Sequence, residues 1–125
     1  MDGENQDRLS YRIIGAAIEV HKQLGPGLLE SVYETALCAE FRLRGIGFER
    51  QKRIDIIYKG ERVGYYIADL IVETRAIVEV KSVDRLADVH TAQLLTYLKL
   101  TGLSAGLLLN FNEATLSKGV KRVLL

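Results

Sequence analysis

Two acidic residues and a lysine could form a hydrolytic centre if a tight turn brings them together. A short polar segment, residues 73–75, separates two runs rich in β-branched and aromatic residues, which predicts a hairpin. If the turn is centred on Thr74, Asp69 and Glu79 face each other, since each lies five residues from that centre. Carboxylates at facing positions have Cβ atoms only about 5 Å apart and repel each other.

Lys81 should lie on the same face as Glu79, because side chains two residues apart on a strand project to the same side. One lysine offsets only part of the repulsion, so a divalent cation between Asp69 and Glu79 is the economical inference. Mg²⁺ or Mn²⁺ suits such hard oxygen ligands. The strand around Asp69 is apolar on both faces, which predicts a central, covered strand. A structural alternative stays open, in which a carboxylate and Lys81 form an ion pair that only satisfies itself.

A second group of polar residues lies on the two helices predicted before the hairpin. Glu30 falls at the edge of a buried arc beside Tyr33, where it could be a first-turn acid stabilised by the helix dipole, whereas Glu34 is expected further outward. Tyr33 is expected to pack with its hydroxyl bonded near the site. His21 lies in an apolar arc, which is typical of a hydrogen-bonded core histidine. Cys38 is expected on the polar side of its helix and to be inert.

On a later predicted helix, Gln93 and Tyr97 are four residues apart and therefore share a face, with His90 beside them. They could be polar residues at an interface between elements, or they could border the site.

These residues are positioned by a predicted order of two helices, three strands, a helix and a strand. Apolar spacing and breaker residues predict helices over residues 10–24, 28–44 and 88–100, and strands over residues 54–58, 62–72, 76–81 and 105–110. Residues 120–125 fit either a strand or a last helical turn. We expect one α/β domain over residues 1–125, with an α+β mixed sheet flanked by helices and with residues 1–9 flexible.

The composition excludes several classes of protein. Hydrophobic residues make up 48% and charged residues 26%, which is ordinary globular usage. No apolar run approaches the roughly 20 residues of a membrane span, and no secretory signal is visible. Cys38 is the single cysteine, which excludes an internal disulfide and fits a reducing cytoplasm. The net charge of +1 weighs against avid unaided binding to DNA.

Several short motifs together resemble one family. They are Val20-His21, the run from Leu24 through Gly27 to Tyr33, Tyr66-Ile67-Ala68-Asp69, Val78-Glu79-Val80-Lys81-Ser82 and the run from Gln93 to Leu98. Over about residues 13–119 the chain is similar to the GxxExxY proteins, a branch of the PD-(D/E)XK nuclease superfamily. One departure is Ala68, which stands where the superfamily's name has proline. The resemblance implies a restriction-endonuclease-like core of order αβββαβ.

The resemblance also implies roles for individual residues. Asp69, Glu79 and the Val80 carbonyl would bind Mg²⁺ or Mn²⁺, with Glu30 as a further candidate ligand, and Lys81 would orient the attacking water. The Q-x-x-x-Y form of Gln93 and Tyr97 resembles a motif of recombination-associated exonucleases that braces the site and contacts substrate. In the family pattern Tyr33 and His21 are further candidates for site-bracing or substrate contacts.

Three hypotheses about function follow. The first is a Mg²⁺-dependent nuclease that hydrolyses phosphodiester bonds in DNA or, as the second choice, RNA. The second is a catalytically inactive module that keeps the fold and binds nucleic acid or a protein partner. The third is a structural domain in which Glu79 and Lys81 simply pair. The partner is expected to be nucleic acid rather than a membrane, in the cytoplasm, and a homodimer would enlarge the surface of so small a chain.

Overall fold

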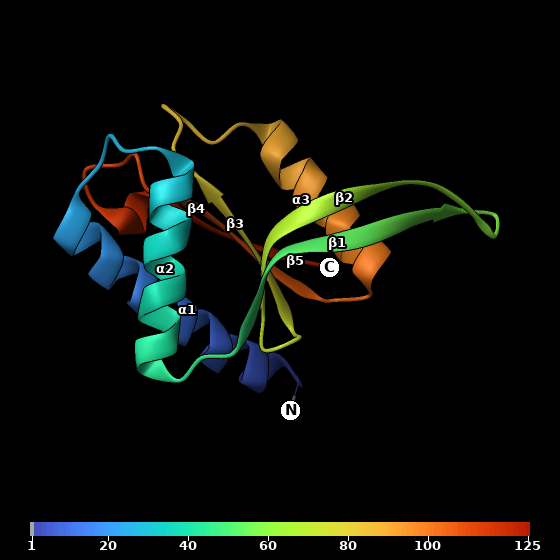
Figure 1. Ribbon diagram of the computed structural model, residues 1–125, viewed down its shortest axis with the longest axis horizontal. Coiled ribbons are helices and arrows are strands. Elements are labelled where there is room, and N and C mark those ends of the chain that lie inside the picture. The colour runs from blue at the N-terminus through green and yellow to red at the C-terminus, as the bar shows by residue number, and fades with distance from the viewer. Residues whose placement is uncertain (1) are drawn as a thin grey trace.

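The computed structural model describes the backbone of residues 2–125 and the side chains from residue 8 onward (Figure 1). Its elements, in chain order, are α1 (Asp2–Leu24), α2 (Glu30–Arg44), β1 (Phe48–Tyr58), β2 (Glu61–Val72), β3 (Ala76–Lys81), α3 (Asp88–Thr101), β4 (Ala105–Asn110), the 3₁₀ helix η1 (Leu116–Gly119) and β5 (Val120–Leu124). The expected order is confirmed, and the undecided end of the chain is a strand.

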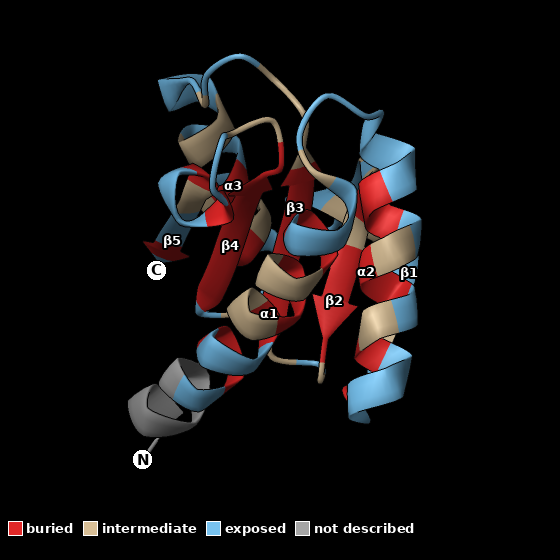
Figure 2. Ribbon diagram, turned by 90° about the vertical axis from the view of Figure 1, so that its left-hand side faces the viewer, coloured by how far each residue is buried: buried red, intermediate tan, exposed pale blue. Residues whose placement is uncertain are grey.

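The strands form one mixed sheet in the order β1-β2-β3-β4-β5. The first three make the expected antiparallel meander, whereas β3 and β4 are parallel and β5 is antiparallel to β4. Parallel neighbours need a crossover connection, which α3 supplies. Figures 1 and 2 show α1 and α2 on one side of the sheet and α3 on the other. This architecture is consistent with the expected restriction-endonuclease-like core.

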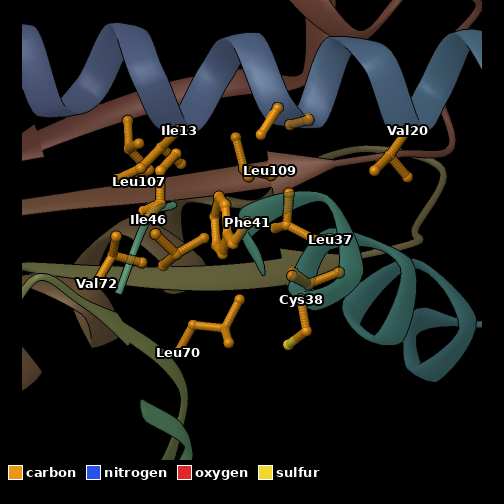
Figure 3. Packing of buried hydrophobic residues seen from close by; sticks show 14 of the residues in the cluster. Ile13, Val20, Leu37, Cys38, Phe41, Ile46, Leu70, Val72, Leu107 and Leu109 are labelled. Carbon is orange, nitrogen blue, oxygen red and sulfur yellow. The ribbon is translucent and has the colours of Figure 1, made fainter. Parts of the chain in front are cut away.

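Two hydrophobic cores lie on the two faces of the sheet. The larger one packs α1 and α2 against the sheet and includes Ile13, Phe41 and Leu109 (Figure 3). The smaller one packs α3 against the other face through Leu94 and Leu98. Because the strands between them are covered on both sides, β3 and β4 are almost entirely buried.

Three sequence expectations need correction at the level of the fold. Helix α1 begins at Asp2 rather than near residue 10, and although much of the segment expected to be flexible lies outside the described side chains, Leu9 is buried. Strand β1 begins at Phe48, six residues before the expected start, because the charged residues of this edge strand hide its alternation. Cys38 is fully buried rather than on a polar face, and burial raises the pKa of its thiol, in keeping with an inert cysteine.

Candidate functional site

Strands β2 and β3 part at the expected position of the carboxylates. Their pairs run from Val72 with Ala76 to Leu70 with Val78, which confirms the register of a turn centred on Thr74. Beyond the last pair, β2 continues with β1 alone and β3 continues beside β4 (Figure 1). The two strands therefore form a fork, and Asp69 and Glu79 are the first residues past the last pair.

The two carboxylates hold the fork by crossed hydrogen bonds. The backbone N–H of Asp69 donates to Glu79 Oε2 at 3.1 Å, and the N–H of Val80 donates to Asp69 Oδ2 at 2.9 Å. Each side chain thus satisfies an amide on the opposite strand at the point where the ladder between the strands stops. The predicted convergence of the two acidic groups is present in the structure.

A kink in β2 accompanies this arrangement. Ala68 packs in the core under α3, whereas Leu70 packs in the core under α1 and α2, although residues two apart on a regular strand share a face. On the neighbouring strand, Gln51 has a left-handed φ of 52°. Because the alternation breaks at Asp69, its carboxylate lies within the fork, where it reaches β3 and the Gln51 side chain.

The fork concentrates negative charge in a buried place. Burial, and then the charge of Asp69, raise the pKa of Glu79 to about 8. Burial also raises the pKa of Asp69, with a further contribution from Glu34, while the Lys81 ammonium counters both shifts only in part. The acidic pair thus retains a proton near neutral pH when no cation is present.

The donor set fits a hard divalent cation. The two carboxylates and the Val80 carbonyl would offer oxygen ligands of the kind that Mg²⁺ and Mn²⁺ prefer. Within the described residues, no group of three or more His, Cys, Asp or Glu side chains is close enough to hold a metal ion. A cation at the fork would therefore take its remaining ligands from backbone, water or substrate, which is usual for Mg²⁺ beside one or two protein carboxylates.

Glu34 is a neighbour of the site that the sequence reasoning placed wrongly. It is only 6% exposed, accepts hydrogen bonds from Arg50 Nε at 2.6 Å and Gln51 Nε2 at 3.0 Å, and thereby joins α2 to β1. The same Gln51 amide lies 3.5 Å from Asp69 Oδ1. The expectation that Glu34 points outward is therefore wrong. Its spacing of four and seven residues from the buried Cys38 and Phe41 is the signal that could have shown this.

Glu30 lies at the other end of the site, in the exposed first turn of α2. Its Oε2 accepts the N–H of Ser82 at 3.1 Å, and the Ser82 hydroxyl donates to the Leu28 carbonyl at 2.7 Å. These contacts fasten the start of α2 to the residue that follows Lys81. Its position fits the structural reading as a first-turn acid, and it also leaves a free carboxylate oxygen at the carboxyl end of β3.

Tyr33 and His21 make structural contacts. The Tyr33 hydroxyl donates to the Gly25 carbonyl at 2.5 Å and accepts the Leu28 N–H at 3.1 Å, so it fixes the segment before α2. His21 Nε2 bonds the Glu113 carbonyl oxygen at 2.8 Å, as expected of a core histidine. His21 also lines a cavity of about 420 Å³ to which neither carboxylate of the fork contributes.

Tyr97 lies on the α3 side of the fork together with Tyr66, to which the sequence analysis gave no role. Its ring stacks on that of Tyr66, with centroids 3.7 Å apart and planes 11° apart. Burial, followed by the charge of Glu79, raises the pKa of both phenols, which places them close to the acidic pair. Gln93 is exposed on the same helix, and His90 Nδ1 accepts the Ala87 N–H at 2.9 Å as a helix cap.

The Tyr66 hydroxyl stands out within the described residues as the one buried side-chain polar atom without a hydrogen-bond partner. Such groups are rare in folded proteins because an unmade hydrogen bond is costly. Tyr66 immediately precedes Ile67 and Ala68 in the motif around Asp69, and that position was the signal that could have marked it.

Comparison with known proteins gives one match. A family model described as PD-(D/E)XK nuclease superfamily covers residues 7–123, whereas no curated protein and no solved structure matches the chain significantly. Nucleases of this superfamily generally use divalent metal ions, and their substrates are nucleic acids. In the described part of the chain, none of the helices has both the length and the apolar composition needed to cross a membrane. Since the match extends over nearly the whole sequence, the chain belongs to the PD-(D/E)XK nuclease superfamily.

Proposed function

We propose that this protein is a Mg²⁺-dependent nuclease that hydrolyses phosphodiester bonds in nucleic acid, with DNA as the expected substrate. The observation that carries the proposal is the fork, where crossed hydrogen bonds hold Asp69 and Glu79 together in a largely buried place. Membership of a nuclease superfamily supports the same reading. Placing two carboxylates so close is costly unless a cation compensates them.

Asp69, Glu79 and the Val80 carbonyl would hold the cation, with Glu30 as a further candidate ligand at the end of β3. A bound Mg²⁺ supplies the positive charge that polarises the phosphoryl oxygen and lowers the pKa of water. Lys81 would orient the attacking water or stabilise the charge that develops on the phosphate. This division of labour needs no histidine as a general base.

The remaining candidates would act around this centre. Tyr97 and Gln93 would contact the substrate from α3, since the Tyr97 ring already borders the acidic pair. Tyr33 and His21 would brace the site indirectly, because their bonds organise the segments before α2 and after β4. A cytoplasmic location and a homodimer stay predictions.

A catalytically inactive module is the rival function, and the net charge of +1 favours it because it provides no general attraction to nucleic acid. The purified protein should therefore be incubated with linear, circular and single-stranded DNA and with RNA, in Mg²⁺ and in Mn²⁺. We expect cleavage that Lys81→Ala lowers by about 100-fold or more, the size of effect typical of lost charge stabilisation. Lys99→Ala, which removes an exposed lysine in the last turn of α3, is the matched control.

Two results would contradict the proposal. One is the absence of cleavage on every substrate with either metal ion, which would favour the inactive module. The other is cleavage that Lys81→Ala and Lys99→Ala leave equally intact, which would place the activity outside the fork.

A further inference from the structure

The hairpin of β1 and β2 extends beyond the body of the protein as a two-stranded arm, residues 52–67. From the pair of Arg53 with Ile67 to the pair of Tyr58 with Glu61, the two strands bond only to each other (Figure 1). A bulge lies between Ile56 and Ile57. Because two-stranded ribbons are at most marginally stable by themselves, an arm with exposed apolar side chains suggests a role other than stability.

The two faces of the arm differ. Ile54 and Tyr66 face α3 and pack against the smaller core. Their neighbours in sequence, Arg53, Tyr65 and Ile67, face the other way by alternation. All three are exposed, Tyr65 to 53% and Ile67 to 41% of their surface. We call this uncovered side the outer face of the arm.

The outer face combines a flat aromatic ring with guanidinium groups. The Arg53 guanidinium lies 4.2 Å from the centroid of the Tyr65 ring, and that of Arg62 lies 5.8 Å from it. Asp55 Oδ1 accepts a hydrogen bond at 3.2 Å from each arginine and so fixes their orientation. Half of each arginine side chain remains exposed. The result is an ordered platform with positive charge and a flat surface.

A second aromatic ring and cation lie at the tip of the arm. Tyr58 is 61% exposed, and the Lys59 ammonium lies 5.5 Å from its ring centroid. Over residues 52–67 there are four cationic and two acidic residues, whereas the rest of the chain is net negative. The arm thus has a net charge of +2 (four basic minus two acidic residues), against −1 for the rest of the chain (13 basic minus 14 acidic residues).

We propose that the outer face of the arm binds single-stranded nucleic acid and guides it into the fork. Aromatic rings and guanidinium planes stack on unpaired bases, and basic side chains contact phosphates, in proteins that bind single strands. Tyr65 precedes Asp69 by four residues of extended strand, about 13 Å at 3.3 Å per residue. A strand lying on the platform would thus reach the acidic pair within a few nucleotides. The inference depends on the proposed function for the site that receives the strand.

The arm also exposes apolar residues such as Ile57 and Val63, which a protein partner or a second copy could cover. The interleaving of tyrosines with cationic groups and the local excess of positive charge favour nucleic acid over protein.

Fluorescence anisotropy with a labelled single-stranded oligothymidylate, in Ca²⁺ rather than Mg²⁺, tests the proposal. We expect Tyr65→Ala to weaken binding about tenfold, as for the loss of one base-stacking ring. Arg62→Ala should lower the slope of log affinity against log salt by about 0.7 if one phosphate contact is lost. Tyr11→Ala, which removes a more exposed tyrosine on α1, is the control and should leave the affinity unchanged.

Hydrolysis of bis(p-nitrophenyl) phosphate in Mn²⁺ separates the arm from the fork, because this small diester needs no arm. Tyr65→Ala should hydrolyse it at the wild-type rate. Oligonucleotide affinity equal to wild type in both arm variants would overturn the proposal while leaving the proposed function intact. A change in sedimentation at unchanged affinity would overturn it in favour of a dimer interface. Loss of affinity in Tyr65→Ala, in a protein that hydrolyses no diester, would support the arm and refute the nuclease.

Discussion

The two halves of β2 lie in contrasting environments. Residues 61–67 pair only with β1 and are largely exposed, whereas residues 70–72 pair with both neighbours and are buried on both faces. Asp69 lies at the border between them. A carboxylate at such a border is buried enough for its pKa to rise, yet remains next to a surface that a substrate can reach. The contrast suggests that the body supplies stability and the arm supplies recognition.

The largest expected effect is a loss of stability caused by a substitution in the buried half of β2. Leu70 is fully buried, so Leu70→Ala should lower the free energy of unfolding by about 2–5 kcal/mol. Val63, on the arm, is 61% exposed, and Val63→Ala should change the free energy of unfolding by no more than about 0.5 kcal/mol. Urea denaturation of both variants measures the difference. Losses of equal size would show that the arm is as much a part of the cooperative core as the body.

An intermediate effect is the pH dependence of stability that arises from Glu79, next to Asp69 at the border between the two halves of β2. In the metal-free protein the pKa of Glu79 is about 8, against 4.5 as the ordinary value, so between these values the folded state binds more protons than the unfolded state. The free energy of unfolding contributed by Glu79 is therefore highest at low pH and falls as the pH rises toward 8. Denaturation in EDTA across pH 5–9 should show this decline, on the order of a few kcal/mol at most.

Glu79→Gln should remove much of that decline, because the amide stays neutral and its oxygen can still accept the Asp69 N–H. Asp55→Asn, which alters an exposed carboxylate of the arm, should leave the decline in place. An unchanged pH profile in Glu79→Gln would mean that the carboxylates of the fork do not carry the excess charge inferred for them.

The smallest effect compares the hydroxyl groups of two tyrosines, Tyr66 and Tyr33. The Tyr66 hydroxyl has no partner, so Tyr66→Phe should leave the free energy of unfolding unchanged or raise it by up to about 1 kcal/mol. The Tyr33 hydroxyl makes two hydrogen bonds, and Tyr33→Phe should lower it by about 1–2 kcal/mol. Thermal denaturation distinguishes them. Equal destabilisation would show that Tyr66 has a hydrogen-bond partner in solution, such as a water molecule.

Local patterns predicted the hairpin register because the turn is short. With three polar residues between two β-branched runs, one centre was possible, and Asp69 and Glu79 then had to meet. Strands β3 and β4 have their predicted bounds because, apart from Glu79, they are apolar up to their last residue and end at polar or turn residues. The order of elements followed from the same change of period from helix to strand.

Other features depended on tertiary contacts that no local pattern shows. Glu34 carries a charge, so its burial required the Arg50 and Gln51 side chains of another element, which the sequence does not place beside it. The kink at Asp69 and the stacking of Tyr66 on Tyr97 likewise depend on contacts between segments far apart in the chain. The length of β1 was underestimated because residues 49–53 are all charged or polar and exposed, so they show no apolar alternation.

The central claim is that Asp69 and Glu79 share one divalent cation, and calorimetric titration with Mn²⁺ tests it most directly. We expect wild-type protein to bind one ion, Asp69→Asn to lose that binding while remaining folded, and Asp55→Asn to bind as wild type does. Asparagine can still accept the Val80 N–H, so the fold should persist. Equal Mn²⁺ affinity in wild type and Asp69→Asn would contradict the account.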